Sequence, residues 1–177
     1  MFTRTAVAWR IQLEPPIIIV QARMSSSRLP GKVMKTVAGQ PMLGYLLDRL
    51  EKIENKQRVV VATSEDNSDD PINLYCDTRQ IECLRGPLNN VAERIYQALE
   101  KTHAKAFVRI SADSPLLDPV LVEKAQKVFF RTKAELATNV LRRTYPKGMS
   151  VEVVDTTAFQ KAYVKMTDVE DREHVTR

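Results

Sequence analysis

Three short, largely apolar runs are spaced along this chain, at residues 17–20, 59–62 and 106–110. Runs of this length without polar alternation are typical of parallel strands that are buried on both faces of a sheet. Each run is followed by a polar loop and then by a segment with helical spacing. We predict helices over 41–53, 71–79, 119–130 and 156–166, and one from Asn89 or Asn90 to Thr102. Shorter strands are expected at 81–84, 134–139 and 150–154, with a hairpin or flap over 142–148.

This alternation predicts right-handed βαβ units and an α/β fold with a mostly parallel sheet that helices cover on both faces. The chain has 177 residues, which suits one domain. We assign residues 17–177 to that domain. Residues 1–16, which end in Pro15 and Pro16, are interpreted as an N-terminal extension that makes a poor signal peptide. No apolar run approaches the roughly 20 residues of a membrane span, so no membrane partner is expected.

Positive charge is concentrated near the N-terminus. The chain carries 27 Lys and Arg against 22 Asp and Glu, yet between Glu14 and Asp48 there is no acidic residue at all. Four cations lie in that stretch: Arg23, Arg28, Lys32 and Lys35. An anionic partner is therefore expected. Since aromatic residues make up only 6% and do not interleave with these cations, nucleic acid is not expected as a partner.

The loop after the first strand, QARMSSSRLPGK, is the strongest candidate for a binding site. Ligands of open α/β sheets bind beyond the carboxyl ends of the strands, where this loop would lie. Its small residues allow the backbone to approach a ligand, and Arg23, Arg28 and Lys32 favour phosphate groups. A P-loop is excluded, because Ser26 stands at the position of its first glycine and Val33 follows Lys32.

A single carboxylate, Asp113, follows the third apolar run directly. It could help to bind a Mg²⁺ that bridges substrate phosphates, since Mg²⁺ takes one or two carboxylates and keeps several waters. It could equally cap the turn formed with Ser114 and Pro115. The phosphate-binding loop favours the metal interpretation.

Other polar clusters are interpreted more simply. Asp66, Asp69 and Asp70 could form a second metal site, but we interpret them as a solvated loop and a favourable charge at a helix start. His174 could act as an acid or base, although a histidine near a chain end is usually just exposed. Cys76 and Cys83 fit a reduced, cytoplasmic protein without disulfides.

Six motifs in chain order resemble the cytidylyltransferase family of the spore-coat polysaccharide biosynthesis type, which is related to synthetases of CMP-activated acidic sugars. They are IIIVQARMSSSRLPGKVMKTVAGQPML, VVVATSEDNSDDPI, LRGPLNNVAERIYQA, VRISADSPLLDP, YPKGMSVEVV and DREHVT. The resemblance implies an α/β fold of the nucleotide-diphospho-sugar transferase type, which is a Rossmann-like three-layer sandwich. It also implies that a sugar or sugar-phosphate oxygen attacks the α-phosphorus of CTP and releases pyrophosphate, in surface or spore-coat polysaccharide synthesis.

The resemblance also implies site residues. Arg28 and Lys32 would hold the triphosphate and Asp113 would bind Mg²⁺. The nucleotide would lie against Gln21, Ala22, Arg23, Ser25, Thr63, Arg85 and Ser111. Related synthetases carry Gln where Ser111 stands. The sugar side would be lined by Arg172, Glu173 and His174.

Two alternatives stay open. Family members usually continue for some tens of residues past Thr176, so the resemblance implies a domain truncated at its C-terminus. A truncated, non-catalytic nucleotide-binding module is therefore one alternative. The other is a glycosyltransferase of related fold. Such enzymes normally show Asp-x-Asp, so the Ser114-Pro115 after Asp113 disfavours this alternative.

A homodimer is a further expectation, because related synthetases take dimer contacts from the region past Thr176.

Overall fold

A computed structural model describes residues 14–26, 28–54 and 56–176. Most of the predicted extension, residues 1–13, lies outside this range. The principal strands are β1 (Ile17–Gln21), β4 (Val59–Ser64), β5 (Glu82–Gly86), β6 (Ala106–Ser111), β7 (Leu136–Thr138) and β8 (Glu152–Asp155). The helices are α1 (Met42–Leu50), α2 (Asp70–Thr78), α3 (Val91–Thr102), α4 (Pro119–Thr132), α5 (Thr156–Tyr163) and α6 (Val169–His174).

The six strands form one sheet in the order β5-β4-β1-β6-β8-β7. The first four are parallel, and β8 is antiparallel to both of its neighbours. The predicted α/β class with a mostly parallel sheet is confirmed. The hairpin predicted over 142–148 falls in the connection between the antiparallel neighbours β7 and β8.

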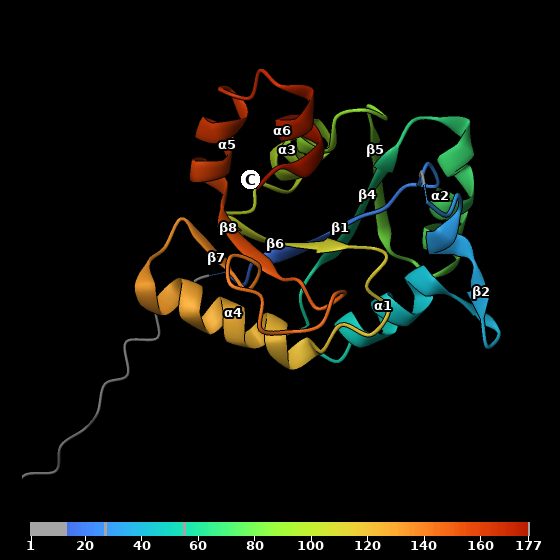
Figure 1. Ribbon diagram of the computed structural model, residues 1–177, viewed down its shortest axis with the longest axis horizontal. Helices are drawn as coiled ribbons and strands as arrows, with labels where there is room; N and C mark the ends of the chain where they lie inside the picture. The colour runs from blue at the N-terminus through green and yellow to red at the C-terminus, as the bar shows by residue number, and fades with distance from the viewer. Residues whose placement is uncertain (1–13, 27, 55, 177) are drawn as a thin grey trace, which may run out of the picture.

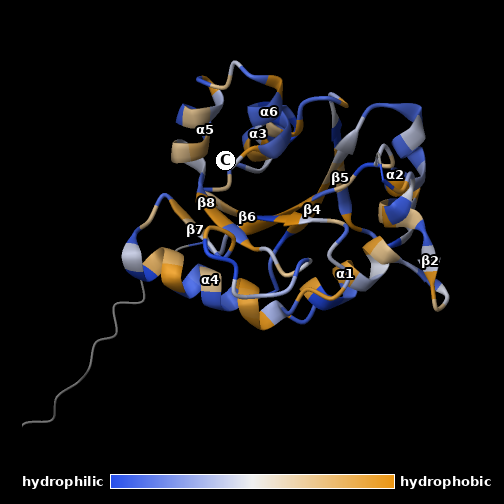
Figure 2. Ribbon diagram, in the orientation of Figure 1, coloured by the Kyte–Doolittle hydropathy of each residue, from blue (hydrophilic) through white to orange (hydrophobic). Residues whose placement is uncertain are grey.

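Helices cover both faces of the sheet, as Figure 1 shows, with α1 and α4 on one side and α3, α5 and α6 on the other. Successive side chains of a strand point to opposite faces. On β1, Ile18 and Val20 therefore pack with α1, α2 and α4, whereas Ile17 and Ile19 pack with α3 and α5. The central strands β1, β4 and β6 are accordingly largely apolar (Figure 2). This explains why the runs at 17–20 and 59–62 show no polar alternation.

Short elements that the sequence analysis did not assign complete the fold. The hairpin of β2 (Thr36–Val37) and β3 (Gln40–Pro41) turns at Ala38 and Gly39, which both have positive φ. Two 3₁₀ turns, η1 (Lys32–Met34) and η2 (Asn67–Asp69), and helix α6 are equally short. Elements of two to six residues show too little periodicity to be predicted. Over the described part of the chain, none of the helices has the length and apolar character needed to cross a membrane.

Candidate functional site

A pocket lies at the carboxyl ends of β1 and β6. The chain places β4 and β5 on one side of β1 and then crosses over to add β6 on the other side. Such a reversal leaves a crevice between the two central strands, where open α/β sheets bind their ligands. The pocket is lined from the loop after β1 by Gln21, Ala22, Arg23, Ser26, Arg28, Lys32 and Val33; from β6 and its loop by Arg109, Ser111, Ala112 and Asp113; from α3 by Val91 and Arg94; and from α6 by Glu173 and His174.

The loop after β1 is held in shape by the backbone of Met24. Its N–H donates to the Oδ1 of Asp69 at 2.6 Å, and its carbonyl accepts from the N–H groups of Ser26 and Gly31, both at 2.8 Å. Gly31 has a φ of 70°, a left-handed conformation that glycine adopts at little cost. Lys32 follows directly, so these bonds fix where its side chain leaves the backbone.

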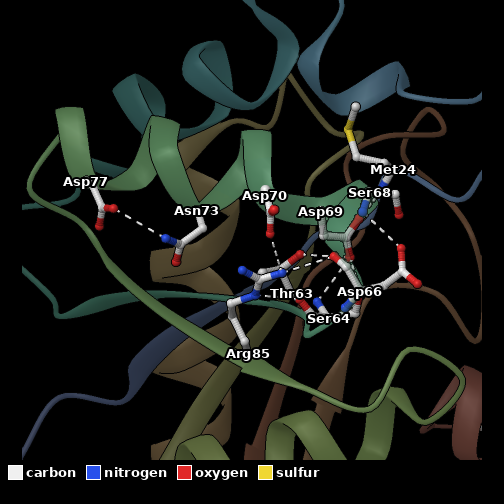
Figure 3. A network of polar contacts seen from close by, with 10 residues as sticks. All are labelled: Met24, Thr63, Ser64, Asp66, Ser68, Asp69, Asp70, Asn73, Asp77 and Arg85. Atoms are coloured by element: carbon white, nitrogen blue, oxygen red, sulfur yellow. Dashed lines mark hydrogen bonds and ion pairs between the residues drawn. The ribbon is translucent and has the colours of Figure 1, made fainter.

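Asp69 joins this loop to the end of β4. Its carboxylate is fully buried, and its Oδ2 accepts from the N–H and hydroxyl of Ser64 at 3.1 and 2.5 Å and from the hydroxyl of Thr63 at 3.1 Å (Figure 3). The interpretation of this acidic cluster as a solvated loop is therefore wrong for Asp69. Asp66 is exposed and caps η2, while Asp70 pairs with Arg85 at 2.7 Å.

Ion pairs cross the pocket between distant segments. Lys32 pairs with Asp113, and Arg23 pairs with Glu173. Burial alone would raise the pKa of Asp113, but hydrogen bonds from Lys32 and from the hydroxyl of Ser111 hold that pKa below its ordinary value. The bond from Arg23 lowers the pKa of Glu173 in the same way. Both carboxyls are therefore charged at neutral pH.

A third ion pair at the pocket is nearly buried. Arg109 pairs with Glu152 on β8 at 2.6 Å and donates to the hydroxyl of Thr176 at 2.7 Å. Its Nε donates to the side chain of Gln21 at 2.9 Å, and Thr176 donates to Glu152. This network ties β1, β6 and β8 to the segment after α6. Arg109 and Gln21 of this network also line an adjoining hollow, together with Val140, Arg143, Ser150 and Glu152.

Most of the site residues predicted from the sequence gather in this pocket. They are Gln21, Ala22, Arg23, Arg28, Lys32, Ser111, Asp113, Glu173 and His174. His174, which the sequence analysis expected to be exposed, is exposed and also lines both the pocket and the adjoining hollow.

Four predicted residues do not line the pocket. Ser25 is exposed beside it, and Thr63 is buried against Asp69. Arg85 donates to the carbonyls of Ser64 and Asp66 at 2.8 and 3.0 Å (Figure 3). Arg172 donates to the carbonyl of Met166 and lines a separate hollow with Val169.

Two pocket cations were not predicted. Arg94 lies in helix α3, and Arg109 lies in strand β6. Both are charged residues on otherwise apolar faces, since Arg94 shares its side of α3 with Val91, Ile95 and Ala98. Their positions on predicted core faces could have identified both arginines as candidate site residues, because charged side chains are seldom fully buried without a partner.

The side chains of the pocket are compatible with one kind of metal site. Among the described residues, no group of three or more His, Cys, Asp or Glu side chains could hold an ion. Asp113 offers a single carboxylate beside the cationic loop. That arrangement fits a Mg²⁺ that takes its other ligands from phosphates and water, and it does not fit an ion held by protein side chains alone.

Comparison with known proteins identifies a family and relatives to which this chain is similar. The family model described as cytidylyltransferase matches residues 17–175. The chain is 27% identical to the spore coat polysaccharide biosynthesis protein of Bacillus subtilis, over 90% of this chain and 68% of the relative. It is 30% identical to an uncharacterized protein of Methanocaldococcus jannaschii, over 89% of this chain and 64% of the relative. It therefore spans only about two thirds of the length of these relatives.

Solved structures agree with this result. A cytidylyltransferase from Leptospira borgpetersenii superposes with a TM-score of 0.86 at 30% identity, over 90% of this chain and 68% of that one. A CMP:2-keto-3-deoxy-manno-octonic acid synthetase, solved in complex with CTP, superposes with a TM-score of 0.69 over 91% of this chain and 82% of that one. Its 16% identity shows the shared fold alone.

Proposed function

Because this chain belongs to the cytidylyltransferase family, we propose that it transfers CMP from CTP to an oxygen of a sugar or sugar-phosphate acceptor. The acceptor oxygen forms a bond to the α-phosphorus of CTP. The bond from that phosphorus to the oxygen bridging the α- and β-phosphates breaks, and pyrophosphate leaves with the electron pair. The observation that supports this proposal best is the set of Arg23, Arg28 and Lys32 beside Asp113 at the switch point of the sheet.

In-line displacement at phosphorus asks for positioning and charge neutralisation more than for covalent chemistry. Arg28 has no ion-pair partner among the described residues and is exposed at the pocket, so it is free to bind a phosphate. Lys32 can exchange Asp113 for a phosphate oxygen. Asp113 would hold a Mg²⁺, which when bound supplies neutralisation of the phosphate charges.

We place the acceptor in the hollow beyond Arg109. Gln21, Ser111 and His174 line both this hollow and the pocket, so an acceptor there could reach the α-phosphorus. Arg143 supplies a cation there, and Ser150 supplies a hydroxyl that can bond to an acceptor oxygen. The name of the Bacillus relative supports an acceptor that enters a surface polysaccharide. Use of CTP and the free Cys76 and Cys83 suit a cytoplasmic location.

The test uses CTP, Mg²⁺ and a panel of sugar acids and sugar phosphates, with pyrophosphate release and product mass as readouts. We expect pyrophosphate to appear only with CTP and an accepted sugar, together with a CMP-sugar of matching mass. CTP binding by calorimetry without turnover on any acceptor would instead identify a non-catalytic nucleotide-binding module. Sugar transfer from a nucleotide sugar would identify a glycosyltransferase.

A further inference from the structure

The chain reverses sharply where it leaves α6. Val175 has a φ of 67° and a ψ of −48°, and the N–H of Thr176 donates to the carbonyl of His174 at 2.7 Å. This is a γ-turn of the rare, strained kind, whose central residue has ideal angles of about +75° and −65°. A β-branched residue such as Val seldom adopts a positive φ. Strain of this kind persists where the surrounding structure enforces it, and it is concentrated at functional sites.

Two neighbouring side chains hold this turn in place. That of Val175 is buried in the apolar cluster between α3 and the sheet. The hydroxyl of Thr176 accepts from Nη1 of Arg109 and donates to Oε1 of Glu152, both at 2.7 Å. Arg109 and Glu152 are opposite residues of β6 and β8, and they pair with each other at 2.6 Å. The hydroxyl therefore bonds through both its donor and its acceptor to groups that are fixed in the sheet.

Helix α6 depends on these contacts because it contributes little to the core itself. It lies beside α3 (Figure 1), but none of its six residues is buried. A short helix is stabilised mainly by packing of an apolar face, so its own sequence does not fix its position here. The buried side chain of Val175 and the bonded hydroxyl of Thr176 follow the helix directly and attach it to the sheet.

The turn also sets the place of two pocket residues. Glu173 and His174 precede it directly and line the pocket, and His174 lines the adjoining hollow as well. Arg109 bonds in addition to Gln21 at 2.9 Å, so one guanidinium fixes the end of β1 and, through Thr176, the end of α6. These are the segments that separate the proposed nucleotide site from the proposed acceptor site. In-line displacement requires the two reactants to be held in alignment across that junction.

We propose that Thr176 is a positioning residue for CMP transfer. Its hydroxyl, held between Arg109 and Glu152, fixes the strained turn at Val175 and thereby keeps Glu173 and His174 at the junction of the pocket and the hollow. Without that hydroxyl, Val175 can relax to a negative φ, which moves His174 away from the junction. Thr176 itself lines the hollow, but its hydroxyl already bonds to two protein groups, so it acts through the turn.

This inference rests on the proposed function, and hydrogen exchange tests its structural half without any substrate. T176V replaces the hydroxyl by a methyl group of similar size, whereas T176S keeps the hydroxyl. T132V is the matched control, since the hydroxyl of Thr132 bonds to the carbonyl of Val128 on the other side of the sheet. Backbone amides of residues 169–176 should exchange faster in T176V than in the wild type, T176S and T132V. Exchange in β6 and β8 should be the same in all four proteins.

Kinetics with CTP, Mg²⁺ and an accepted sugar then tests the positioning. In T176V, kcat should fall by about 10- to 100-fold, because a misplacement of about 1 Å can slow such a reaction about 100-fold. The Kd for CTP should stay within about threefold of the wild-type value, because Thr176 lies outside the triphosphate site. T176S should keep most of the wild-type kcat. T176A makes the same comparison if T176V is unstable.

Three results would overturn the proposal. Unchanged exchange in T176V would show that the hydroxyl does not fix the turn. Faster exchange with an unchanged kcat would show that the turn does not position the reactants. A raised KM for the acceptor, with exchange and kcat unchanged, would show direct contact between Thr176 and the acceptor. A wild-type protein that converts no acceptor would instead refute the proposed function, and the exchange comparison would still decide whether Thr176 fixes the turn.

Discussion

Lys32 and Asp113 form an ion pair although 81 positions separate them in the sequence. One residue follows the loop after β1, and the other follows β6. They meet because β1 and β6 are parallel neighbours, with Gln21 opposite Ser111 at their carboxyl ends. In this pair the ammonium of Lys32 neutralises the carboxylate to which we assign Mg²⁺. Binding of metal and triphosphate as proposed would therefore require both residues to exchange partners.

Replacing Lys32 by Ala should weaken CTP binding far more than replacing Lys35 by Ala. A charge-assisted bond to phosphate contributes roughly 1.5–3 kcal/mol, which corresponds to about 10- to 150-fold in Kd. Lys35 is exposed and does not line the pocket, so its loss should change Kd by less than about threefold. Calorimetric titration of both variants with CTP and Mg²⁺ checks this. Equal effects of the two changes would contradict the placement of the triphosphate.

Asp113→Asn should remove the Mg²⁺ dependence of CTP binding. The amide is a much weaker ligand for Mg²⁺, so the tightening of CTP binding by Mg²⁺ should fall by about tenfold or more. In the absence of metal, the variant should bind CTP at least as well as the wild type, because Lys32 no longer has a carboxylate to leave. Titrations in Mg²⁺ and in a chelator measure both effects. A variant that keeps the full Mg²⁺ effect would show that the ion binds elsewhere.

Asp69→Ala should lower both stability and CTP affinity. The change leaves the buried N–H of Ser64 and the half-buried N–H of Met24 without acceptors, which should cost about 3–5 kcal/mol in the free energy of unfolding. Ser64→Ala is the comparison, since it removes one donor and leaves the bond to Met24, with an expected cost of about 1 kcal/mol. Urea denaturation measures the stability and calorimetry the CTP affinity. Similar losses of CTP affinity in both variants would show that the bond to Met24 does not position the loop.

Glu173→Gln should make the stability of the protein less dependent on pH in the acid range. The pKa of Glu173 lies below its ordinary value of 4.5 because Arg23 bonds to the charged form. The folded protein therefore takes up this proton less readily than the unfolded chain does. The stabilisation is complete above about pH 4.5 and disappears as the pH falls through the lowered pKa. As the pH is lowered from 6 to 3, the melting temperature should fall more steeply in the wild type than in the variant. Parallel curves would refute the contribution of this pair.

The order of elements follows from local patterns, which is why the sequence predicted it well. The helix start at Asn90 is confirmed, and its side chain accepts from the N–H of Glu93 at 2.9 Å. The strands at 17–20 and 59–62 extend by one and two residues beyond their predicted ends. Such features depend on neighbours a few positions apart, so a single sequence contains the information.

The placement of polar side chains was predicted less well than the order of elements. Thr63 and Arg85 do not line the pocket and instead bond to Asp69 and Asp70, so their expected contact with the nucleotide stays a prediction. Asp69 was expected in solvent and is instead fully buried. Whether a polar residue faces water, a core or a ligand depends on what the rest of the chain packs against it, and no local pattern reports that.

The sequence by itself determined the α/β alternation, the cationic loop after the first strand and the carboxylate after the third, because each depends on residues close together in the chain. The tertiary structure alone decided that a buried aspartate holds this loop in place. It also decided that Arg109 pairs with a carboxylate, whereas Arg94 forms no ion pair with another residue that the structure describes. The physical reason is that the residues available to pair with a buried charge lie on strands and helices that meet only when the sheet has assembled. The order of its strands, with β1 between β4 and β6, therefore sets where the charges of this pocket converge.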